Sequence, residues 1–334
     1  MSRPGRLLLG IDGGASKTAG VVITDSGEIV ARARVGGSAI VGPPSAESCA
    51  VLSSLAESLL AQAGASRADI AAWGVGLNGI DLEDELPAQR AGIAAALGAP
   101  EGELTLVNDA IAALWGASPR PAATILHYGS GFTAAHRAGY GRECLFDHLH
   151  VARTFDMRWE LMAVVARMLN GMAEPTPLRD RALAHFQVDA DAYCEAVFRK
   201  RIPRPLRLST PPLIYQFWLE GDPAAAELVE RAADDYALAT NAMIAATGHP
   251  AADAVFGGGV IATAPPEFWA LLAERVHRFC PRAQVKSPDL AADIGAAIMA
   301  AFHTGLSPSD LFPPLLEEEA ALGAPLAPTE ESES

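Results

Sequence analysis

The sequence predicts an α/β protein built from two similar halves, and three observations support this fold class. Short aliphatic runs with β-branched residues alternate with longer amphipathic segments, as in folds that layer helices on a sheet. A unit of strand, glycine turn and strand occurs at residues 7–24 and again at 123–136, which indicates internal duplication. The length of 334 residues favours two domains.

The first half begins with two short apolar runs, 7–9 and 20–23, that are expected to pair as a hairpin. Ser45 is a suitable N-cap for an amphipathic helix, and turn residues such as Asn78 mark the end of a buried strand. After the hairpin, strands are predicted at 28–35, 70–77 and 104–107, and helices at 45–63, 84–97 and 110–115.

The second half follows a proline-rich stretch at 118–121 and repeats the hairpin unit. Residues 156–248 are expected to be mostly helical, and the longest helix, 223–247, has Asp222 as N-cap and Gly248 as its stop signal. Residues 306–334 contain no Lys or Arg but several Glu and Pro, so this tail is expected to be disordered. Strands are predicted at 123–128, 132–136, 140–146, 253–256 and 284–286, and further helices at 265–279 and 290–302.

Composition and charge exclude several classes of function. The formal net charge of −15 argues against non-specific binding to nucleic acid or to an anionic membrane. Apolar runs stay short of the roughly 18 residues that span a bilayer, and the N-terminal segment lacks an adequate signal-peptide core. We therefore expect a soluble cytoplasmic protein whose partner is a small molecule. The four cysteines form no C-x-x-C pair and are expected to be reduced thiols.

The N-terminal hairpin carries the first chemical signal. Asp12 ends a buried strand, where an unpaired carboxylate is costly unless it holds a cation or water. The glycine turn after it can point backbone N–H groups at an anion. A Walker loop needs glycine where Ser16 stands, and the dinucleotide motif G-x-G-x-x-G is absent. We predict a different phosphate-binding turn, with Asp12 near a metal ion.

Three other places could complete a phosphotransfer site. The turn 129–131, GSG, could hold phosphates from the second half, and the glycine triplet 257–259 allows close approach of a base or ribose. Asp109 follows a strand in the sequence VNDA and is the best candidate for a general base toward an acceptor hydroxyl. Asn78 and Asp81 end another strand and could reach the acceptor.

These segments resemble a known family. LLGIDGGASKT, LVNDAIAAL, HYGSGF, AVFGGGV and AADIGAAIMAA, in this order between Leu8 and Ala301, are similar to the motifs of the N-acetylglucosamine kinase and BadF/BadG/BcrA/BcrD ATPase family, within the actin, Hsp70 and hexokinase superfamily. The resemblance implies a two-domain, actin-like and hexokinase-like ATPase fold with an interdomain cleft. Residues 1–118 and a returning helix, 288–304, would form one domain, and 119–287 the other.

The same resemblance implies the site and its cofactors. ATP and Mg²⁺ would be bound, Asp12 would hold Mg²⁺ through water, and Asp109 would be the catalytic base. Asn78, Asn108 and Asp156 would contact the substrate together with Asp109, and a homodimer is expected. The residues expected to bind ATP and its phosphates are Asp12, Gly13, Gly14, Ser16, Lys17, Thr18, Gly129, Ser130, Gly131, Gly257, Gly258 and Gly259.

The acceptor side departs from the family pattern. Ser38 and Ala39 stand where the family has Ser-Asn, whose Asn helps to hold the sugar, and Phe132 replaces a hydroxyl after the second turn. The segment FDMRW keeps Asp156 but lacks the Glu and Gly that follow this Asp in the family. Nucleotide features are thus mostly retained, whereas sugar contacts are largely lost.

The leading hypothesis is an ATP- and Mg²⁺-dependent kinase that phosphorylates a hydroxyl of a small sugar or amino sugar, with an N-acetylglucosamine-like acceptor. The alternative is an ATPase or nucleotide-gated regulator without sugar transfer. An iron–sulfur activator of acyl-CoA dehydratases would need clustered cysteines, which the chain lacks. Arg153 and Arg158 could bind an anionic acceptor. Asp147, His148 and His150 are interpreted as loop residues and not as zinc ligands.

Overall fold

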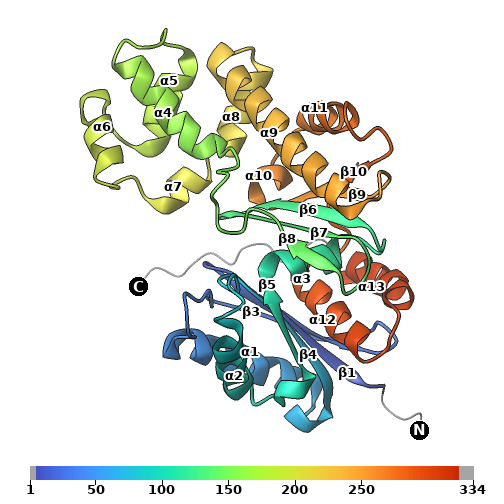
Figure 1. Ribbon diagram of the computed structural model, residues 1–334. Helices are drawn as coiled ribbons and strands as arrows, with labels where there is room; N and C mark the ends of the chain where they lie inside the picture. The colour runs from blue at the N-terminus through green and yellow to red at the C-terminus, as the bar shows by residue number, and fades with distance from the viewer. Residues whose placement is uncertain (1–4, 323–334) are drawn as a thin grey trace. The chain divides into compact units, whose positions relative to one another are not determined.

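The computed structural model describes residues 5–322, which divide into two compact units (Figure 1). Unit 1 contains the described residues up to Pro119 and those from Pro288 onward, and unit 2 is Arg120–Ser287. Each unit contains one five-stranded mixed sheet with helices packed against it. The α/β class predicted from the sequence is therefore confirmed.

The two sheets have the same topology. The strands of unit 1 are β1 (Leu7–Gly13), β2 (Thr18–Thr24), β3 (Ile29–Val35), β4 (Ile70–Leu77) and β5 (Leu104–Asn108), in the order β3-β2-β1-β4-β5. Those of unit 2 are β6 (Ala123–Tyr128), β7 (Phe132–Arg137), β8 (Glu143–Leu145), β9 (Asp253–Gly257) and β10 (Gln284–Lys286), in the order β10-β9-β6-β7-β8. In each sheet the first three strands are antiparallel and the last two run parallel to the first. This shared order supports the internal duplication.

The helices begin and end close to the predicted limits, and the longest, α9, matches its prediction at both ends. Asp222 caps its first turn by accepting hydrogen bonds from two backbone N–H groups, and Gly248 ends it in the left-handed conformation. The helices are α1 (Ala46–Ala63), α2 (Leu86–Leu97), α3 (Asp109–Ala117), α4 (Met157–Leu169), α5 (Pro177–Phe186), α6 (Ala190–Phe198), α7 (Arg204–Leu208), α8 (Pro211–Leu219), α9 (Pro223–Thr247), α10 (Gly259–Ala262), α11 (Pro266–His277), α12 (Ala292–His303) and α13 (Pro308–Leu322), with short 3₁₀ turns at Arg67–Asp69 and Glu101–Glu103.

Helices cover both faces of the sheet in unit 1. Leucines of α1 pack on one face, where they join the buried side chains of β1 and β4. On the other face α12 crosses β1 and β4 at very short range, because Gly10 and Gly74 lie beneath it. A Cβ atom at Gly10 would lie 2.1 Å from the carbonyl oxygen of Asp293, and one at Gly74 would lie 1.9 Å from that of Ala296. The returning helix therefore belongs to the core of unit 1.

The expectation that residues 306–334 are disordered is wrong for 308–322, which form α13. Leu311, Phe312 and Leu315 are buried, and Arg32 of β3 forms an ion pair with Glu319. The acidic composition concealed this apolar face, since hydrophobic burial outweighs the self-repulsion of a few surface acids. The remainder of the predicted tail, from residue 323 onward, lies outside the described residues.

Two smaller features concern the predicted third strand of unit 2 and the cysteines. The strand expected at 140–146 is limited to the three residues of β8, because a turn occupies the preceding positions. All four cysteines are free thiols. Within residues 5–322, every helix is too short or too polar to cross a bilayer.

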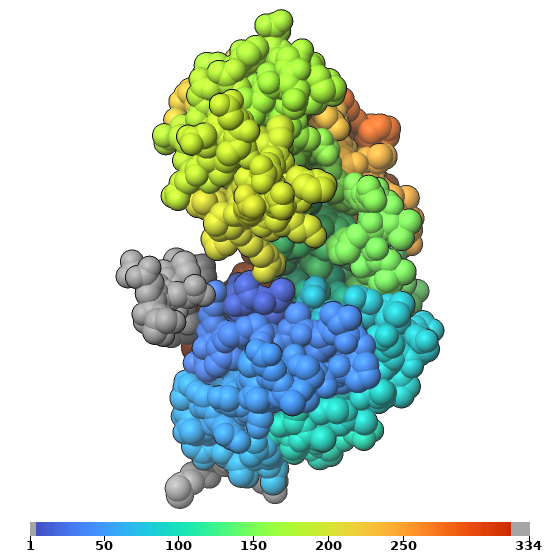
Figure 2. Space-filling view, turned by 90° about the vertical axis from the view of Figure 1, so that its left-hand side faces the viewer, coloured from blue at the N-terminus to red at the C-terminus, as the bar shows by residue number. Residues whose placement is uncertain are grey.

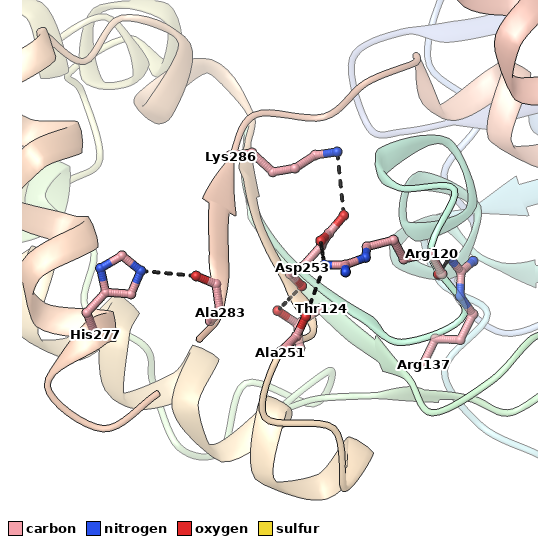
Figure 3. A network of polar contacts seen from close by, with 8 residues as sticks. All are labelled: Arg120, Thr124, Arg137, Ala251, Asp253, His277, Ala283 and Lys286. Atoms are coloured by element: carbon pink, nitrogen blue, oxygen red, sulfur yellow. Dashed lines mark hydrogen bonds and ion pairs between the residues drawn. The ribbon is translucent and has the colours of Figure 1, made fainter. Parts of the chain in front are cut away.

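A network of charged residues, of which Asp253 and Arg137 are buried, lies where strands β6 and β9 begin (Figure 3). Asp253, only 2% exposed, accepts a hydrogen bond from Nη1 of Arg120 at 3.0 Å, and its other carboxylate oxygen lies 3.6 Å from Nζ of Lys286. Arg137, which is fully buried, donates to the carbonyl oxygens of Arg120 and Pro121. Because Arg120 opens unit 2 and Lys286 lies next to its end, Asp253 joins the two ends of this unit.

Replacing Asp253 with Asn should destabilise unit 2. The substitution keeps the shape of the side chain but leaves Arg120 and Lys286 without their shared counter-ion, so we expect the free energy of unfolding to fall by about 2 kcal/mol. Chemical denaturation measures this change. The matched control is Glu174→Gln, which removes an exposed carboxylate of the same unit. Equal stabilities of the two variants would contradict the structural role of Asp253.

Candidate active site

Three neighbouring strands of unit 1 end at the same edge of the sheet. In the parallel register Gly13 of β1 lies beside Leu77 of β4, and Leu77 lies beside Asn108 of β5. The polar residues at these strand ends, Asp12, Asn78 and Asp109, are thereby brought together. The carboxyl edge of parallel strands is the usual place for ligands in α/β proteins.

The turn between β1 and β2, residues 14–17, leaves backbone N–H groups available as hydrogen-bond donors. The N–H of Gly14 donates to the carbonyl oxygen of Lys17 at 2.9 Å, which closes the turn. The N–H groups of Ala15 and Ser16 have no acceptor within the described part of the chain, and the Lys17 side chain is exposed. Two free N–H groups beside a lysine are suited to a phosphate group.

The loop after β3 supports this turn. The N–H groups of Ser38 and Ala39 both donate to the carbonyl oxygen of Gly14, at 3.0 and 3.2 Å. The hydroxyl of Thr18, fully buried, donates to Oγ of Ser38 at 2.8 Å. Thr18, predicted as a phosphate contact, is therefore engaged inside the unit, and Ser38, which stands where the family also has Ser, holds the turn in place.

Asp12 lies half-buried among other carboxylates. It shares the face of the sheet on which α3 and α12 begin, because it is two residues beyond Gly10 on β1. Burial raises its pKa from 3.8 to about 7, with the nearby charges of Asp109 and Asp293 acting in the same direction and Lys17 opposing them. A carboxylate in this state gains most from a cation placed beside it.

Sequence reasoning missed Asp293, which lies in the first turn of α12. It is 1% exposed, and one of its oxygens has no hydrogen-bond partner among the described residues, although Nε of Arg32 lies 3.6 Å away. Burial raises its pKa. The available signal was a single acid within the small apolar residues of AADIGAAIMAA.

Asp109 opens α3 and is held in place by one neighbour. Its Oδ2 accepts a hydrogen bond from Nδ2 of Asn78 at 3.4 Å, and its Oδ1 is enclosed with no hydrogen-bond partner among residues 5–322. Burial raises the pKa of Asp109 from 3.8 to about 6, while the hydrogen bond from Asn78 and nearby backbone N–H groups lower it. An enclosed carboxylate with one free oxygen and a pKa near neutrality is suited to accept a proton.

Asn108, predicted to contact the substrate, is occupied by local contacts. Its Oδ1 accepts from the N–H of Ala110 at 2.8 Å and so caps α3, and its Nδ2 donates to Asp81 at 2.8 Å. Asp81 is therefore held by Asn108, and Asn78 is held by Asp109.

The predicted glycine segments of unit 2 lie beside each other. Strands β6 and β9 are parallel neighbours, so the turn Gly129–Gly131 and the triplet Gly257–Gly259 follow adjacent strand ends. Gly258 has a φ of +87°, and a Cβ atom there would lie 2.3 Å from the backbone of Tyr128. Only glycine fits this position.

The turn Gly129–Gly131 of unit 2 is closed by a backbone hydrogen bond and anchored by Arg158. The N–H of Gly129 donates to the carbonyl oxygen of Gly131 at 2.9 Å, while Nη1 of Arg158 donates to the carbonyl oxygen of Gly129 at 2.7 Å. Asp156, the predicted substrate contact, caps α4 and binds Arg158 through both carboxylate oxygens, at 2.9 and 3.0 Å. This carboxylate is therefore neutralised within unit 2.

The chemistry of unit 1 fits a hydrated divalent cation near Asp12. Hard cations such as Mg²⁺ prefer carboxylate oxygens and retain several waters. Asp12 has a raised pKa, and Asp109 and Asp293, each with one carboxylate oxygen that lacks a hydrogen-bond partner among the described residues, lie near it. Within residues 5–322, no three His, Cys, Asp or Glu side chains form a direct metal cage, and this holds for Asp147, His148 and His150 as well.

The duplicated sheets and their glycine turns define a protein of actin-like architecture, the class that includes sugar kinases. Residues 9–300 match the model of the BadF/BadG/BcrA/BcrD ATPase family, and the chain belongs to this family. A comparison with curated proteins gives no match.

Solved structures of sugar kinases share the fold at low sequence identity. A candidate N-acetylglucosamine kinase from Chromobacterium violaceum has a TM-score of 0.66 and 21% identity, covering 89% of this chain and 99% of that one. A second such candidate, from Porphyromonas gingivalis, has a TM-score of 0.65 and 17% identity, covering 89% and 99%. A glucokinase of the ROK family from Streptomyces griseus, in complex with glucose and AMPPNP, has a TM-score of 0.57 and 18% identity, covering 87% and 98%.

The substitution Asp12→Asn should stabilise the ligand-free protein at neutral pH. Between pH 3.8 and about 7 the folded state holds a proton on Asp12 that the unfolded chain releases, so stability falls as the pH rises through this range. Asparagine does not titrate, and at pH 8 we expect a gain on the order of 2 kcal/mol. Denaturation at pH 5 and pH 8, without nucleotide or metal, measures the effect. A variant less stable than the wild type at pH 8 would disprove the electrostatic account.

Proposed function

We propose that this protein is an ATP-dependent kinase that transfers the γ-phosphoryl group to a hydroxyl of a small sugar or amino sugar. The observation that carries the proposal is the environment of Asp109: enclosed, oriented by Asn78, with one free oxygen and a pKa raised to about 6. As general base, Asp109 would take the proton of the acceptor hydroxyl as that oxygen attacks the phosphorus.

The nucleotide would be bound through backbone groups. The free N–H groups of Ala15 and Ser16 and the ammonium of Lys17 support phosphate binding at the first turn. The turn Gly129–Gly131 supports phosphate binding in unit 2, and the open space beside Gly259, where a Cβ atom would meet no other atom, suits the adenosine moiety. Mg²⁺, held through water by Asp12, would supply positive charge to the phosphate oxygens. Positioning and electrostatics provide most of the rate in this chemistry.

An N-acetylglucosamine-like acceptor is the first choice. The candidate N-acetylglucosamine kinases and the glucokinase that holds glucose and AMPPNP support a sugar acceptor through the shared fold. We further propose a homodimer, as is common for soluble enzymes, and a cytoplasmic location.

An ATPase or regulator without phosphotransfer is the second candidate. It is favoured by the occupied carboxylate of Asp156, which Nε and Nη2 of Arg158 neutralise. Measuring ADP release over a panel of sugars and amino sugars separates the two. Acceptor-dependent ADP formation supports the kinase, whereas a rate unaffected by every acceptor supports the alternative.

The variant Asp109→Asn should lose phosphotransfer but keep nucleotide binding. Removal of a general base lowers kcat by about 10²–10⁴-fold. The Kd for ATP, measured by calorimetry, should stay within about twofold because Asp109 faces the acceptor hydroxyl and not the nucleotide. Asp84→Asn, which changes an exposed carboxylate of the same unit, serves as control and should behave as wild type. Wild-type transfer by Asp109→Asn would reject the assignment.

The pH dependence of kcat/KM should report the same group. Asp109 must be deprotonated to accept a proton, so kcat/KM for the acceptor, measured at saturating ATP and Mg²⁺ so that the proton of Asp12 is already displaced, should rise with pH up to about 6 and then level off. Asn78→Ala removes a hydrogen bond that lowers this pKa, and it should move the rise to higher pH. Steady-state kinetics between pH 5 and 8 measure both curves. An unshifted curve in Asn78→Ala would count against Asp109 as the titrating base.

A further inference from the structure

Two adjoining cavities lie in unit 2, the first of them beside the turn Gly129–Gly131. The first, of about 170 Å³, is lined by Ser130 of that turn together with Arg158, Arg204 and Arg207. The second, of about 180 Å³, is lined by Lys200 and again by Arg207. Trp159 and Met162 line both cavities, so the two form one groove around Trp159. We call this the Trp159 groove.

The cations of this groove come from one short segment. Residues 199–207, RKRIPRPLR, contain five basic residues and no acid, although acids outnumber bases by 40 to 25 in the whole chain. Figure 2 shows the segment, in yellow, at the surface of unit 2. In so acidic a protein, a cluster of basic residues of which only some have an acidic partner calls for an explanation in terms of a ligand.

The segment divides into paired and unpaired cations. Arg199 and Arg201 form ion pairs with Glu195, outside the groove. Arg204 is exposed and has no polar partner among residues 5–322, and the guanidinium of Arg207 stacks on the ring of Trp159 at 4.8 Å. The unpaired cations are therefore those that line the groove.

Arg158 links the groove to the second turn. It is 5% exposed, binds Asp156 through two nitrogens and donates its third to Gly129. Its charge is already compensated, so Arg204, Arg207 and Lys200 supply the net positive potential. The Arg158–Asp156 pair fastens the turn that carries Ser130 to the start of α4, which also carries Trp159.

Trp159 gives the groove an apolar wall. Its side chain is 53% exposed and also borders a larger cavity of about 800 Å³. A half-exposed indole beside guanidinium groups suits a ligand with one apolar face and one anionic substituent.

We propose that the Trp159 groove binds the anionic group of the acceptor, and that the substrate is a sugar bearing a carboxylate or a phosphate. The inference rests on the proposed kinase function and narrows its substrate class. Arg204 and Arg207 pair with the anion, and Trp159 packs against the sugar ring. The sugar lies next to the turn that binds phosphate, and the cations replace the sugar contacts that this chain has lost.

Calorimetry with the full-length, nucleotide-free protein at low salt tests the proposal with three ligands of one scaffold: N-acetylglucosamine, the matching uronic acid and the 6-phosphate. At least one anionic ligand should bind about tenfold more tightly than N-acetylglucosamine. The double variant Arg204→Gln/Arg207→Gln should abolish this preference. The matched control, Arg201→Gln, removes a cation of the same segment outside the groove and should retain it.

The two anionic ligands also separate the sources of the charge. Preference for the uronic acid indicates a carboxylate substrate, and preference for the 6-phosphate indicates a sugar phosphate. Equal binding of all three sugars, no binding of either anion, an unchanged preference in the double variant, or tighter binding of a short DNA oligonucleotide would each overturn the inference. Phosphotransfer is assayed separately. If the protein phosphorylates a neutral sugar and shows no preference for anionic ligands, the kinase proposal stands and the anionic substrate is refuted. If it binds anionic sugars specifically but transfers no phosphate to them, the anion-binding groove stands and the kinase proposal is refuted.

Discussion

The burial of three carboxylates on one face of the first sheet is the constraint on which the site depends. Glycines in β1 and β4 let α12 approach the sheet, and this close packing places Asp293 near Asp12. The first turn of α3 brings Asp109 to the same face. Burial raises the pKa of Asp12 and Asp109, and the charges of Asp109 and Asp293 raise that of Asp12 further, so the ligand-free protein holds these groups in an unfavourable state. A cation bound beside Asp12 would relieve that cost.

The duplication explains how a single topology provides two glycine turns of different chemistry. In each sheet the antiparallel hairpin supplies a turn, and the next parallel strand ends beside it. In unit 1 the neighbouring strand ends carry the titratable carboxyl group of Asp109 and the amide of Asn78 that donates a hydrogen bond to it. In unit 2 the corresponding strand end carries only glycines, which permit close backbone contact. The two copies have thus diverged in chemistry while keeping the same strand order.

The sequence predicted most of the fold because its local signals agree with one another. β4, β6 and α9 have the predicted limits, since each is bounded by clear turn or capping residues. The helix α13 was not predicted, because its apolar residues Leu311 and Phe312 stabilise a helix only by packing against the rest of unit 1. Asp293 and the pair formed by Arg158 and Asp156 were also beyond reach. Their roles depend on contacts between segments, and a single sequence contains no direct record of such contacts.

The most direct test of the electrostatic account is the number of protons released when Mg²⁺–ADP binds. Calorimetry at pH 7 in buffers of different ionisation enthalpy gives this number for the wild type and for Asp12→Asn. Since Asp12 is partly protonated at this pH, cation binding should expel its proton, and the wild type should release more protons than the variant. Equal proton release by the two proteins would show that Asp12 does not respond to the bound cation, and the central claim would fail.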